Sequence, residues 1–469
     1  MRTFLRAAVR VLPGALVALV GLIALTNVVG HAEEPAAAAS GLPTHLSTPV
    51  LSARRVVDEL VEPVGEQRLA GKLQPFAASL GASSCLSVTI DGKEIVDTHG
   101  DTPLLPASTL KLLTGSAALD VLGADHVYTT SVRATAAPVG GVVNGDVWLV
   151  GGGDPLLATQ DYVHTFRRPP DPVTPLESLA DKIAAAGVTQ ITGRVVGDES
   201  RYDAVRYVPS WPQRYINAPE IGPMSALTVN DGFMSNNSFR AAANPAESGA
   251  QTLVDLLVAR GVTVGGVGSG VAPDGTVEIA SIQGAPLPSV VGEDLRISDN
   301  GTAELLLKEI GHATSGTGST AAGAAAVVSH LRDAGLPVDG LVMNDGSGLD
   351  RGDRATCNLL TSVLDRAGPQ SDLTNDLSIA GETGTLDRRL ANTVVAGKVR
   401  AKTGTLTGVA GLAGFAQGAD GTEVTFALLL NGDQSNSAFA MWMQLLTTLI
   451  GYPDVSGLSG LGPLPATAR

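Results

Sequence analysis

Cysteine and clustered histidine are scarce in this chain, and their scarcity excludes several kinds of site. Only two cysteines occur among 469 residues, Cys85 and Cys357. Two cysteines do not make a disulfide framework, and the sequence leaves open whether they form a single bridge. The seven histidines are scattered, and neither Cys-x-x-Cys nor His-Glu-x-x-His occurs. Zinc sites built on those motifs are therefore excluded.

The chain also lacks any lysine- or arginine-rich tract, and its charge balance is acidic. Lysine and arginine total 31 residues against 46 aspartates and glutamates, which gives a formal net charge of −15. A surface of that sign repels phosphate backbones, so we expect no nucleic acid among the partners. Apolar residues make up 44% of the chain and charged residues 16%, as is typical of a globular protein.

The N-terminus has the pattern of an export segment. Three arginines within the first ten residues precede an uncharged run over residues 11–30, followed by the small residue Ala32. Residues 1–32 are predicted to be a signal peptide cleaved after Ala32 or, alternatively, an uncleaved membrane anchor, since the run is long enough to span a bilayer. In both cases we expect the body to be exported to the cell envelope, touching the membrane only through this segment. Residues 33–55 predict a flexible linker.

Beyond the linker, the secondary-structure pattern of the sequence changes along the chain. Residues 86–100 alternate apolar and polar residues around Asp91-Gly92, as in a β-hairpin, and residues 106–122 have a helical pattern that ends at Gly123. Short strands and helices of a different texture fill residues 126–286. This segment is predicted to be a separate, smaller α+β unit.

Helices and antiparallel strands then return. Helical patterns lie near residues 298–311 and 320–334, and strand patterns surround an Asp420-Gly421 turn before a last helix. The order predicts an α+β fold in which one domain, made of residues 56–125 and 287–455, is interrupted by the unit at 126–286. Residues 456–469 form a Gly/Pro-containing tail.

Ser108 and Lys111, in the stretch PASTLKLLTG, are the first candidates for chemistry. At positions i and i+3 of a helix their side chains share one face. A serine hydroxyl needs an adjacent base to act as a nucleophile. A lysine is such a base only where burial or a neighbouring cation lowers its pKa, and leucines surround this pair. The alternative is a helix cap with a solvated charge.

The triplet Ser298-Asp299-Asn300 is the second candidate. Ser298 could relay a proton near the nucleophile, and Asn300 could donate an amide hydrogen bond to substrate. The alternative is a helix-capping turn, since all three residue types favour such positions.

The triplet Lys402-Thr403-Gly404 is the third. A lysine here could bind a carboxylate and help to lower the pKa of Lys111, and Gly404 could let substrate approach a strand closely. The N–H of Thr405 could supply half of an oxyanion hole. The alternative is a strand followed by an ordinary turn.

In this order, Ser-x-x-Lys, Ser-Asp-Asn and Lys-Thr-Gly are the motif set of serine β-lactamases and penicillin-binding proteins. The long gap between the first two motifs narrows the choice. The chain resembles the D-alanyl-D-alanine carboxypeptidase/endopeptidases of the class C low-molecular-mass penicillin-binding proteins, which insert a domain there. The stretches LVGGGDPLL, NDGSGLDRGDRAT and AGETGTLDRRL add to a likeness that covers roughly residues 55–455.

The resemblance implies a β-lactamase/transpeptidase-like domain, with an antiparallel sheet flanked by helices, interrupted by the smaller α+β domain. It implies an exported serine DD-carboxypeptidase, also acting as a DD-endopeptidase in relatives, which cleaves peptidoglycan stem peptides without a metal or organic cofactor. β-Lactams would acylate the same serine. Ser108 would form the acyl-enzyme, Lys111 would deprotonate it, and Ser298 would pass a proton to the leaving D-alanine.

The other site residues would hold the substrate. Asn300 would hold the peptide, and Lys402 with Thr403 would bind its terminal carboxylate beside Gly404. The N–H groups of Ser108 and Thr405 would form the oxyanion hole. Two other functions stay open: a β-lactamase, which would deacylate penicillin rapidly, and a catalytically inactive cell-wall-binding scaffold of the same fold.

Two departures from the family pattern are visible. Some relatives place an acidic residue just after a tryptophan to face the substrate's diamino acid, whereas SWPQRYINAPEIG has Trp211 but no acid before Glu220. Asp350 replaces a serine in DGSGLDR. We expect that second segment to serve structural turns and helix caps.

Overall fold

The computed structural model describes residues 58–166, 170–234 and 240–455. The predicted signal peptide or anchor, the linker and the C-terminal tail lie outside these residues. Within the described ranges, no helix has both the length and the apolar character needed to cross a membrane.

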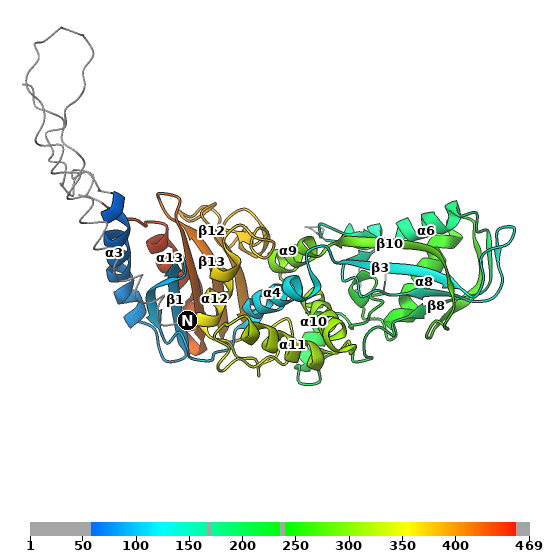
Figure 1. Cartoon of the computed structure of the whole chain (residues 1–469), viewed down its shortest axis with the longest axis horizontal. Coiled ribbons are helices and arrows are strands. Elements are labelled where there is room, and N and C mark those ends of the chain that lie inside the picture. The colour runs from blue at the N-terminus through cyan, green and yellow to red at the C-terminus, as the bar shows by residue number, and fades with distance from the viewer. Residues whose placement is uncertain (1–57, 167–169, 235–239, 456–469) are drawn as a thin grey trace, which may run out of the picture. The chain divides into compact units, whose positions relative to one another are not determined.

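Six antiparallel strands form the main sheet, in the order β11-β12-β13-β14-β1-β2. Figure 1 labels β1, β12 and β13 of this sheet. The strands are β1 (Ser84–Ile90), β2 (Lys93–Thr98), β11 (Ser378–Ile379), β12 (Val399–Leu406), β13 (Val409–Gln417) and β14 (Glu423–Asn431). The hairpin predicted around Asp91-Gly92 and the strands predicted around Asp420-Gly421 are both present. β1 pairs with β14, so the two ends of the described chain meet in one sheet.

Helices cover both faces of the main sheet. One face carries α3 (Asp58–Ala78) and α13 (Ala438–Leu449), and the other carries α4 (Lys111–Leu122) and α12 (Cys357–Ala367). Because strand side chains alternate between faces, Phe426 and Leu428 of β14 pack with the first pair of helices while Leu429 packs with the second. The α+β prediction is confirmed, and the sheet is buried on both sides.

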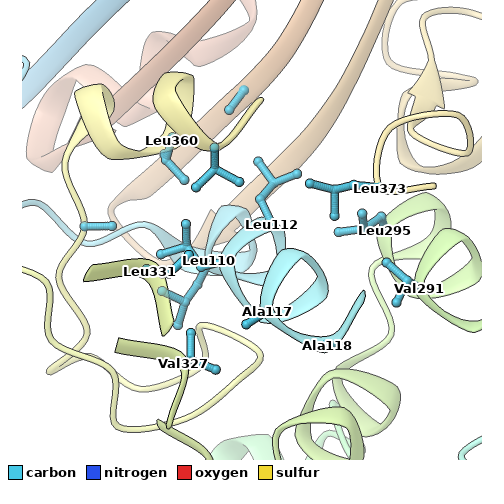
Figure 2. Packing of buried hydrophobic residues seen from close by; sticks show 14 of the residues in the cluster. Leu110, Leu112, Ala117, Ala118, Val291, Leu295, Val327, Leu331, Leu360 and Leu373 are labelled. Carbon is cyan, nitrogen blue, oxygen red and sulfur yellow. The ribbon is translucent and has the colours of Figure 1, made fainter. Parts of the chain in front are cut away.

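Helix α4 lies in the middle of one apolar cluster. Its Leu112 and Ala117 are fully buried, and Figure 2 shows them surrounded by side chains from other helices, among them Leu295 and Leu331. A helix that is buried on all sides is held rigidly by its neighbours. The side chain at the first position of α4, that of Lys111, is therefore held in a fixed position.

The helix predicted to start at Pro106 begins later. Ala107 has φ 47°, a left-handed conformation that an α-helix excludes, and Ala107–Leu110 form a short 3₁₀ turn before α4. The predicted end is confirmed, because Gly123 caps α4 with φ 86°.

Three further helices pack around α4. They are α9 (Leu287–Ile297), α10 (Asn300–Ser315) and α11 (Thr320–Asp333). α10 and α11 lie close to the helical patterns predicted from the sequence.

A second, mixed sheet is built entirely from residues 127–286. Its order is β10-β3-β5-β8-β4, with β9 also pairing with β8. Its strands are β3 (Val127–Ala134), β4 (Val142–Val143), β5 (Val147–Val150), β8 (Gln190–Asp198), β9 (Thr263–Ser269) and β10 (Val277–Pro286). Helices α6 (Leu176–Ala185) and α8 (Pro245–Val258) share its apolar core. Short elements complete this part: β6 (Leu157–Ala158), β7 (Thr174–Pro175), α5 (Gln160–Val163) and α7 (Gln213–Asn217).

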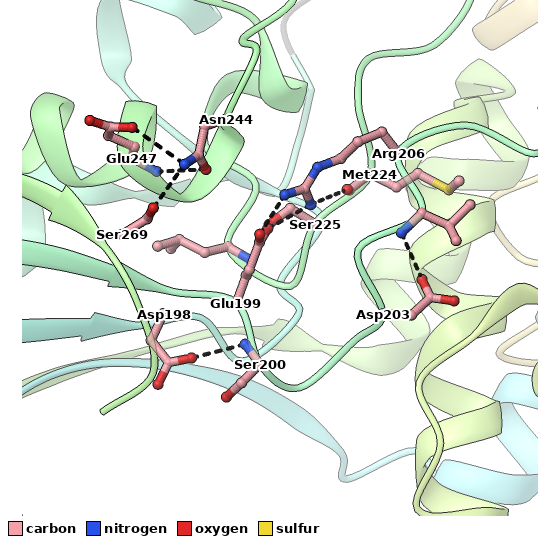
Figure 3. Close-up of polar contacts among 12 residues, drawn as sticks. Asp198, Glu199, Ser200, Asp203, Arg206, Met224, Ser225, Asn244, Glu247 and Ser269 are labelled. Carbon is pink, nitrogen blue, oxygen red and sulfur yellow. Dashed lines mark hydrogen bonds and ion pairs between the residues drawn. The ribbon is translucent and has the colours of Figure 1, made fainter. Parts of the chain in front are cut away.

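Glu199, just after β8, organises the segment that leads to α7. Arg206 donates from Nη1 to Glu199 Oε2 at 2.6 Å and to the carbonyl oxygen of Met224 at 3.0 Å, and Ser225 also donates to Glu199 (Figure 3). A bidentate arginine–carboxylate pair of this kind fixes orientation as well as distance. The segment between residues 199 and 225 is thereby tied together at its base, and it carries α7.

Cys85 and Cys357 form a disulfide, with Cα atoms 6.0 Å apart, which settles the question that the sequence left open. Cys85 lies in β1 and Cys357 is the first residue of α12, so the bridge joins the sheet to a covering helix. Both residues are fully buried.

Replacing both cysteines by alanine is expected to lower the free energy of unfolding by about 3–5 kcal/mol, because the bridge closes a very long loop of the unfolded chain. The two cysteines are 272 residues apart. Chemical denaturation measures the loss, and wild-type protein refolded under reducing conditions is the matched control. A loss below about 1 kcal/mol would contradict the expectation.

Candidate active site

Ser108 stands on a turn that two other segments press against. A side chain at Gly404 would place its Cβ 2.6 Å from the carbonyl oxygen of Pro106 and 3.2 Å from the backbone nitrogen of Ser108. Gly348, with φ 81°, likewise meets the backbone of Ala107. Glycine is required at 404 because strand β12 passes directly over the protein's own turn, which differs from the substrate approach expected from the sequence. Gly404 therefore brings β12 against Ser108.

Lys111 meets Ser108 at the buried start of α4. Its Nζ lies 3.0 Å from Ser108 Oγ, 2.8 Å from Asn300 Oδ1 and 2.8 Å from the carbonyl oxygen of Ser347. Burial lowers the pKa of Lys111, against the opposing pull of nearby carboxylates, Asp294 first. The amide oxygen and the carbonyl oxygen can only accept hydrogen bonds. A neutral amine that donates to both would direct its lone pair at the one partner able to donate, the Ser108 hydroxyl.

The Ser-Asp-Asn triplet connects α9 to α10. Ser298 ends α9 with φ 65°, and the side chain of Asp299 caps α10 by accepting from the Thr302 backbone N–H at 2.6 Å. The capping role considered as an alternative is thus real for Asp299, and it directs Ser298 and Asn300 toward the site. Asn300 also donates from Nδ2 to the carbonyl oxygen of Glu220 at 2.7 Å.

The side chain of Lys402, a residue of strand β12, is fully buried within the protein. Its Nζ donates to Ser298 Oγ at 2.7 Å and to the carbonyl oxygen of Thr403 at 2.9 Å. Burial, and next the positive charge of Lys111, hold the pKa of Lys402 well below its usual range. Lys402 therefore acts on Ser298 and on the electrostatics of Lys111 more directly than on any group in the open cavity.

A cavity of about 520 Å³ lies in front of these residues. Five of the eight site residues predicted from the sequence line it: Ser108, Ser298, Asn300, Thr403 and Thr405. The two lysines reach Ser108 and Ser298 through the contacts above, and Gly404 supplies the close approach of β12. The structure thus brings all eight residues together from four separate elements.

Sequence reasoning missed part of the cavity wall. Thr385 and Arg389, from the loop between β11 and β12, and Arg214 and Tyr215, from α7, also line it. Thr403 Oγ1 donates to Thr385 Oγ1 at 2.8 Å. The sequence signal for Thr385 and Arg389 is the polar stretch AGETGTLDRRL, which contains two threonines and two arginines.

Both departures from the family pattern have a clear location. Asp350 is buried and does not line the cavity; it accepts the backbone N–H of Gly352 at 2.6 Å and the hydroxyl of Ser210. Trp211 donates from Nε1 to Asp345 at 2.8 Å. After this tryptophan, Arg214, Tyr215, Ala218 and Glu220 line the cavity, so the first acid of the segment to reach it is Glu220.

Buried carboxylates lie behind the site. Glu304 accepts hydrogen bonds from the backbone N–H groups of Gly346, at 2.9 Å, and Ser347, at 2.8 Å. These bonds hold in place the loop whose Ser347 carbonyl oxygen accepts a hydrogen bond from Lys111. Asp294 is fully buried, and neither of its carboxylate oxygens has a hydrogen-bond partner in the described structure. Burial raises the pKa of Asp294 to about 7, while Lys111 and Lys402 oppose that rise.

Asp294→Asn is expected to move the acidic limb of the kcat/KM pH profile to lower pH, by up to about one unit. The carboxylate raises the pKa of Lys111, so removing its charge lowers that pKa and leaves the amine neutral at lower pH. Glu293→Gln, on the same helix but paired with Arg296, is the matched control. A limb that stays in place or moves to higher pH would contradict the expected coupling.

Within the described ranges, no three histidine, cysteine, aspartate or glutamate side chains are grouped so that they could hold a metal ion.

Comparison with known proteins adds to this geometry. The sequence profile of the D-Ala-D-Ala carboxypeptidase 3 (S13) family matches residues 78–242 and 235–448. A D-alanyl-D-alanine carboxypeptidase of Actinomadura sp. (strain R39) is 30% identical over 449 residues, covering 78% of this chain and 80% of the relative. Carboxypeptidase Rv3627c of Mycobacterium tuberculosis is 32% identical over 368 residues, covering 75% and 76%.

A solved structure has the same fold. Penicillin binding protein 4 (dacB) from Haemophilus influenzae aligns with a TM-score of 0.69 at 22% identity, covering 81% of this chain and 99% of that one. The fold class predicted from the sequence is confirmed by this likeness.

Proposed function

Since the chain belongs to the D-Ala-D-Ala carboxypeptidase 3 (S13) family, we propose that it is an exported serine DD-carboxypeptidase acting through a Ser108 acyl-enzyme. Family membership makes the chain a hydrolase of the D-Ala-D-Ala carboxypeptidase type. The proposal adds the substrate, the terminal D-alanine of peptidoglycan stem peptides, and the residues that act on it. The observation that carries it is the 3.0 Å contact between Ser108 Oγ and a buried Lys111 Nζ.

Acylation follows from that contact. Neutral Lys111 takes the proton of Ser108 while Oγ attacks the carbonyl carbon between the last two D-alanines. Negative charge then develops on the carbonyl oxygen, which the backbone N–H groups of Ser108 and Thr405 would bind as an oxyanion hole. Gly404 supports this role because it lets the backbone at Thr405 lie beside the backbone of Ser108.

Expulsion of D-alanine needs a proton on its nitrogen. Ser298 lines the cavity and accepts a hydrogen bond from Lys402 at 2.7 Å, so its hydroxyl hydrogen can point toward the leaving group. The proton that Lys111 took would return through Ser298 as the carbon–nitrogen bond breaks. Water then hydrolyses the ester, with Lys111 again as base.

Export to the cell envelope fits the substrate and the disulfide. Peptidoglycan lies outside the cytoplasm, and disulfides persist in oxidising compartments, as the buried Cys85–Cys357 bridge requires. Residues 11–30, where uncleaved, would anchor the chain in the membrane.

The test is to incubate the purified chain with diacetyl-L-Lys-D-Ala-D-Ala and measure released D-alanine, and in parallel to label it with a fluorescent penicillin. We expect D-alanine release and a persistent penicillin adduct that peptide mapping places on Ser108. A cross-linked muropeptide dimer measures endopeptidase activity in the same assay.

Other outcomes identify the alternatives. Rapid loss of the adduct with release of hydrolysed penicillin would indicate a β-lactamase. A folded chain that releases no D-alanine and takes no label would indicate a cell-wall-binding scaffold, and would refute the proposal.

A further inference from the structure

The carboxylate at the end of the substrate needs a partner that the three motifs do not supply. From the sequence, Lys402 was expected to bind it with Thr403. In the structure the Lys402 ammonium is fully buried and already donates to Ser298 Oγ and to the Thr403 carbonyl oxygen. It does not line the cavity. A carboxylate that leaves water without a charged or well-placed donor loses much of its binding free energy.

Arg389 is the guanidinium placed to receive it. The loop between β11 and β12 brings Arg389 to the cavity wall, and its Nη1 lies 3.4 Å from Thr405 Oγ1. Its side chain is exposed, and its Cζ lies 6.0 Å from the centroid of the Trp442 ring. No carboxylate of the described chain forms an ion pair with it. A planar fork of N–H donors is thus open to the cavity.

The position of Arg389 also suits the expected position of the substrate carboxylate. The terminal carboxylate of a D-Ala-D-Ala peptide is attached one residue beyond the carbonyl that is attacked. That carbonyl oxygen is expected at the N–H of Thr405, whose side chain is the one that Arg389 contacts. One residue spans about 3.5 Å, so the carboxylate would lie close to Thr405, whose Oγ1 is 3.4 Å from Arg389 Nη1.

We propose that Arg389 binds the terminal carboxylate of the substrate, together with the hydroxyl groups of Thr403 and Thr405, and thereby selects peptides with a free carboxyl end. The proposal rests on the proposed function. It gives Lys402 a different role, which is to orient the hydroxyl group of Ser298 through their hydrogen bond. The ligand is the carboxylate of a peptide or, equally, that of a penicillin.

Arg214 is the competing guanidinium in the same cavity. It stacks over Tyr215, with Cζ 4.7 Å from the ring centroid, and donates from Nη2 to Tyr215 Oη at 3.2 Å. It comes from α7, on the wall formed by the interrupting segment, whereas Arg389 comes from the loop beside β12. Arg214→Gln therefore removes the same charge from the same cavity at a different place, which makes it a matched control.

The experiment crosses two substrates with three variants. The substrates are diacetyl-L-Lys-D-Ala-D-Ala and its C-terminal amide, which differ only in the terminal charge. We measure kcat/KM for both with the wild type, Arg389→Gln, Arg389→Lys and Arg214→Gln. Arg389→Gln is expected to lower kcat/KM for the free acid by about 10- to 100-fold, mainly through KM, and to leave the amide nearly unchanged. Arg389→Lys should recover part of the loss, because it restores a charge without the fork.

The acid-to-amide ratio is the decisive readout, because general damage to the fold would lower both rates together. An unchanged ratio in Arg389→Gln, or an equal fall in Arg214→Gln, would overturn the assignment. Acylation by benzylpenicillin compared with its methyl ester gives the same ratio without peptide turnover. If the wild type processes neither peptide and neither penicillin, the proposed function fails and the role of Arg389 fails with it. If it processes them but the ratio does not change, only the role of Arg389 is refuted.

Discussion

Ser108→Ala is expected to release D-alanine at the background rate, a loss of about 10⁴-fold or more, and to take no penicillin label. Removing the nucleophile leaves no atom that can form the acyl-enzyme, and the remaining donors only bind substrate. Ser108 is partly exposed on a short 3₁₀ turn, so removing one oxygen atom there costs little stability.

The matched control for this result is Ser347→Ala. The Ser347 hydroxyl is buried beside the same network without a hydrogen-bond partner in the described structure, and only its backbone carbonyl contacts Lys111. Both variants should melt near the wild-type temperature, but only Ser108→Ala should be inactive. Residual labelling of Ser108→Ala at another residue would show that the nucleophile is elsewhere.

Lys111→Met is expected to lower the rate of penicillin acylation by about 10²- to 10⁴-fold, which is the usual contribution of a general base. Methionine fills nearly the same buried volume and removes the amine that contacts Ser108 Oγ, Asn300 Oδ1 and the Ser347 carbonyl. Stopped-flow labelling measures the acylation step alone.

Lys308→Met separates a base from a merely buried lysine. Lys308 is also fully buried, but it pairs with Asp203 on another part of the protein. The Lys308→Met variant should be less stable than the wild type, but its acylation rate should equal that of the wild type after correction for the folded fraction. An acylation rate in Lys111→Met within a factor of ten of the wild type would contradict a base at this position.

The sequence predicted the parts of the site that depend on local spacing. Ser108 and Lys111 are three residues apart, so a single helical turn brings them together. The strand that carries Lys402 to Gly404 was likewise predicted, as part of the strand patterns around the Asp420-Gly421 turn. The Ser298-Asp299-Asn300 triplet also forms the capping turn that its residue types predict, because Asp299 caps α10.

Other features depend on topology, which spacing does not encode. Arg389 reaches Thr405 only because β11 and the loop after it fold back along β12. The burial of Lys402 depends on which helix covers that end of the strand. Cys85 and Cys357 meet because β1 pairs with β14 and α12 packs on the same face. Helix α3 was not predicted, and its low amphipathic character explains why: its residues, including Pro63 and Pro75, give little helical pattern.

The position of β1 in the main sheet also determines when the protein can be completed. Apart from β2, its hairpin neighbour, β1 pairs only with β14 among the described strands, so the central pairing joins segments more than 300 residues apart. While the chain is being made, the hairpin β1–β2 presents an unpaired edge, and α4 has no sheet to lie against. The second sheet, made only of residues 127–286, has all its strands much earlier. A sheet of such high contact order forms slowly, and its open edge is prone to aggregation. The nucleophile Ser108, which lies against Gly404 of β12, would therefore reach its final environment only after residues 399–431 have been made.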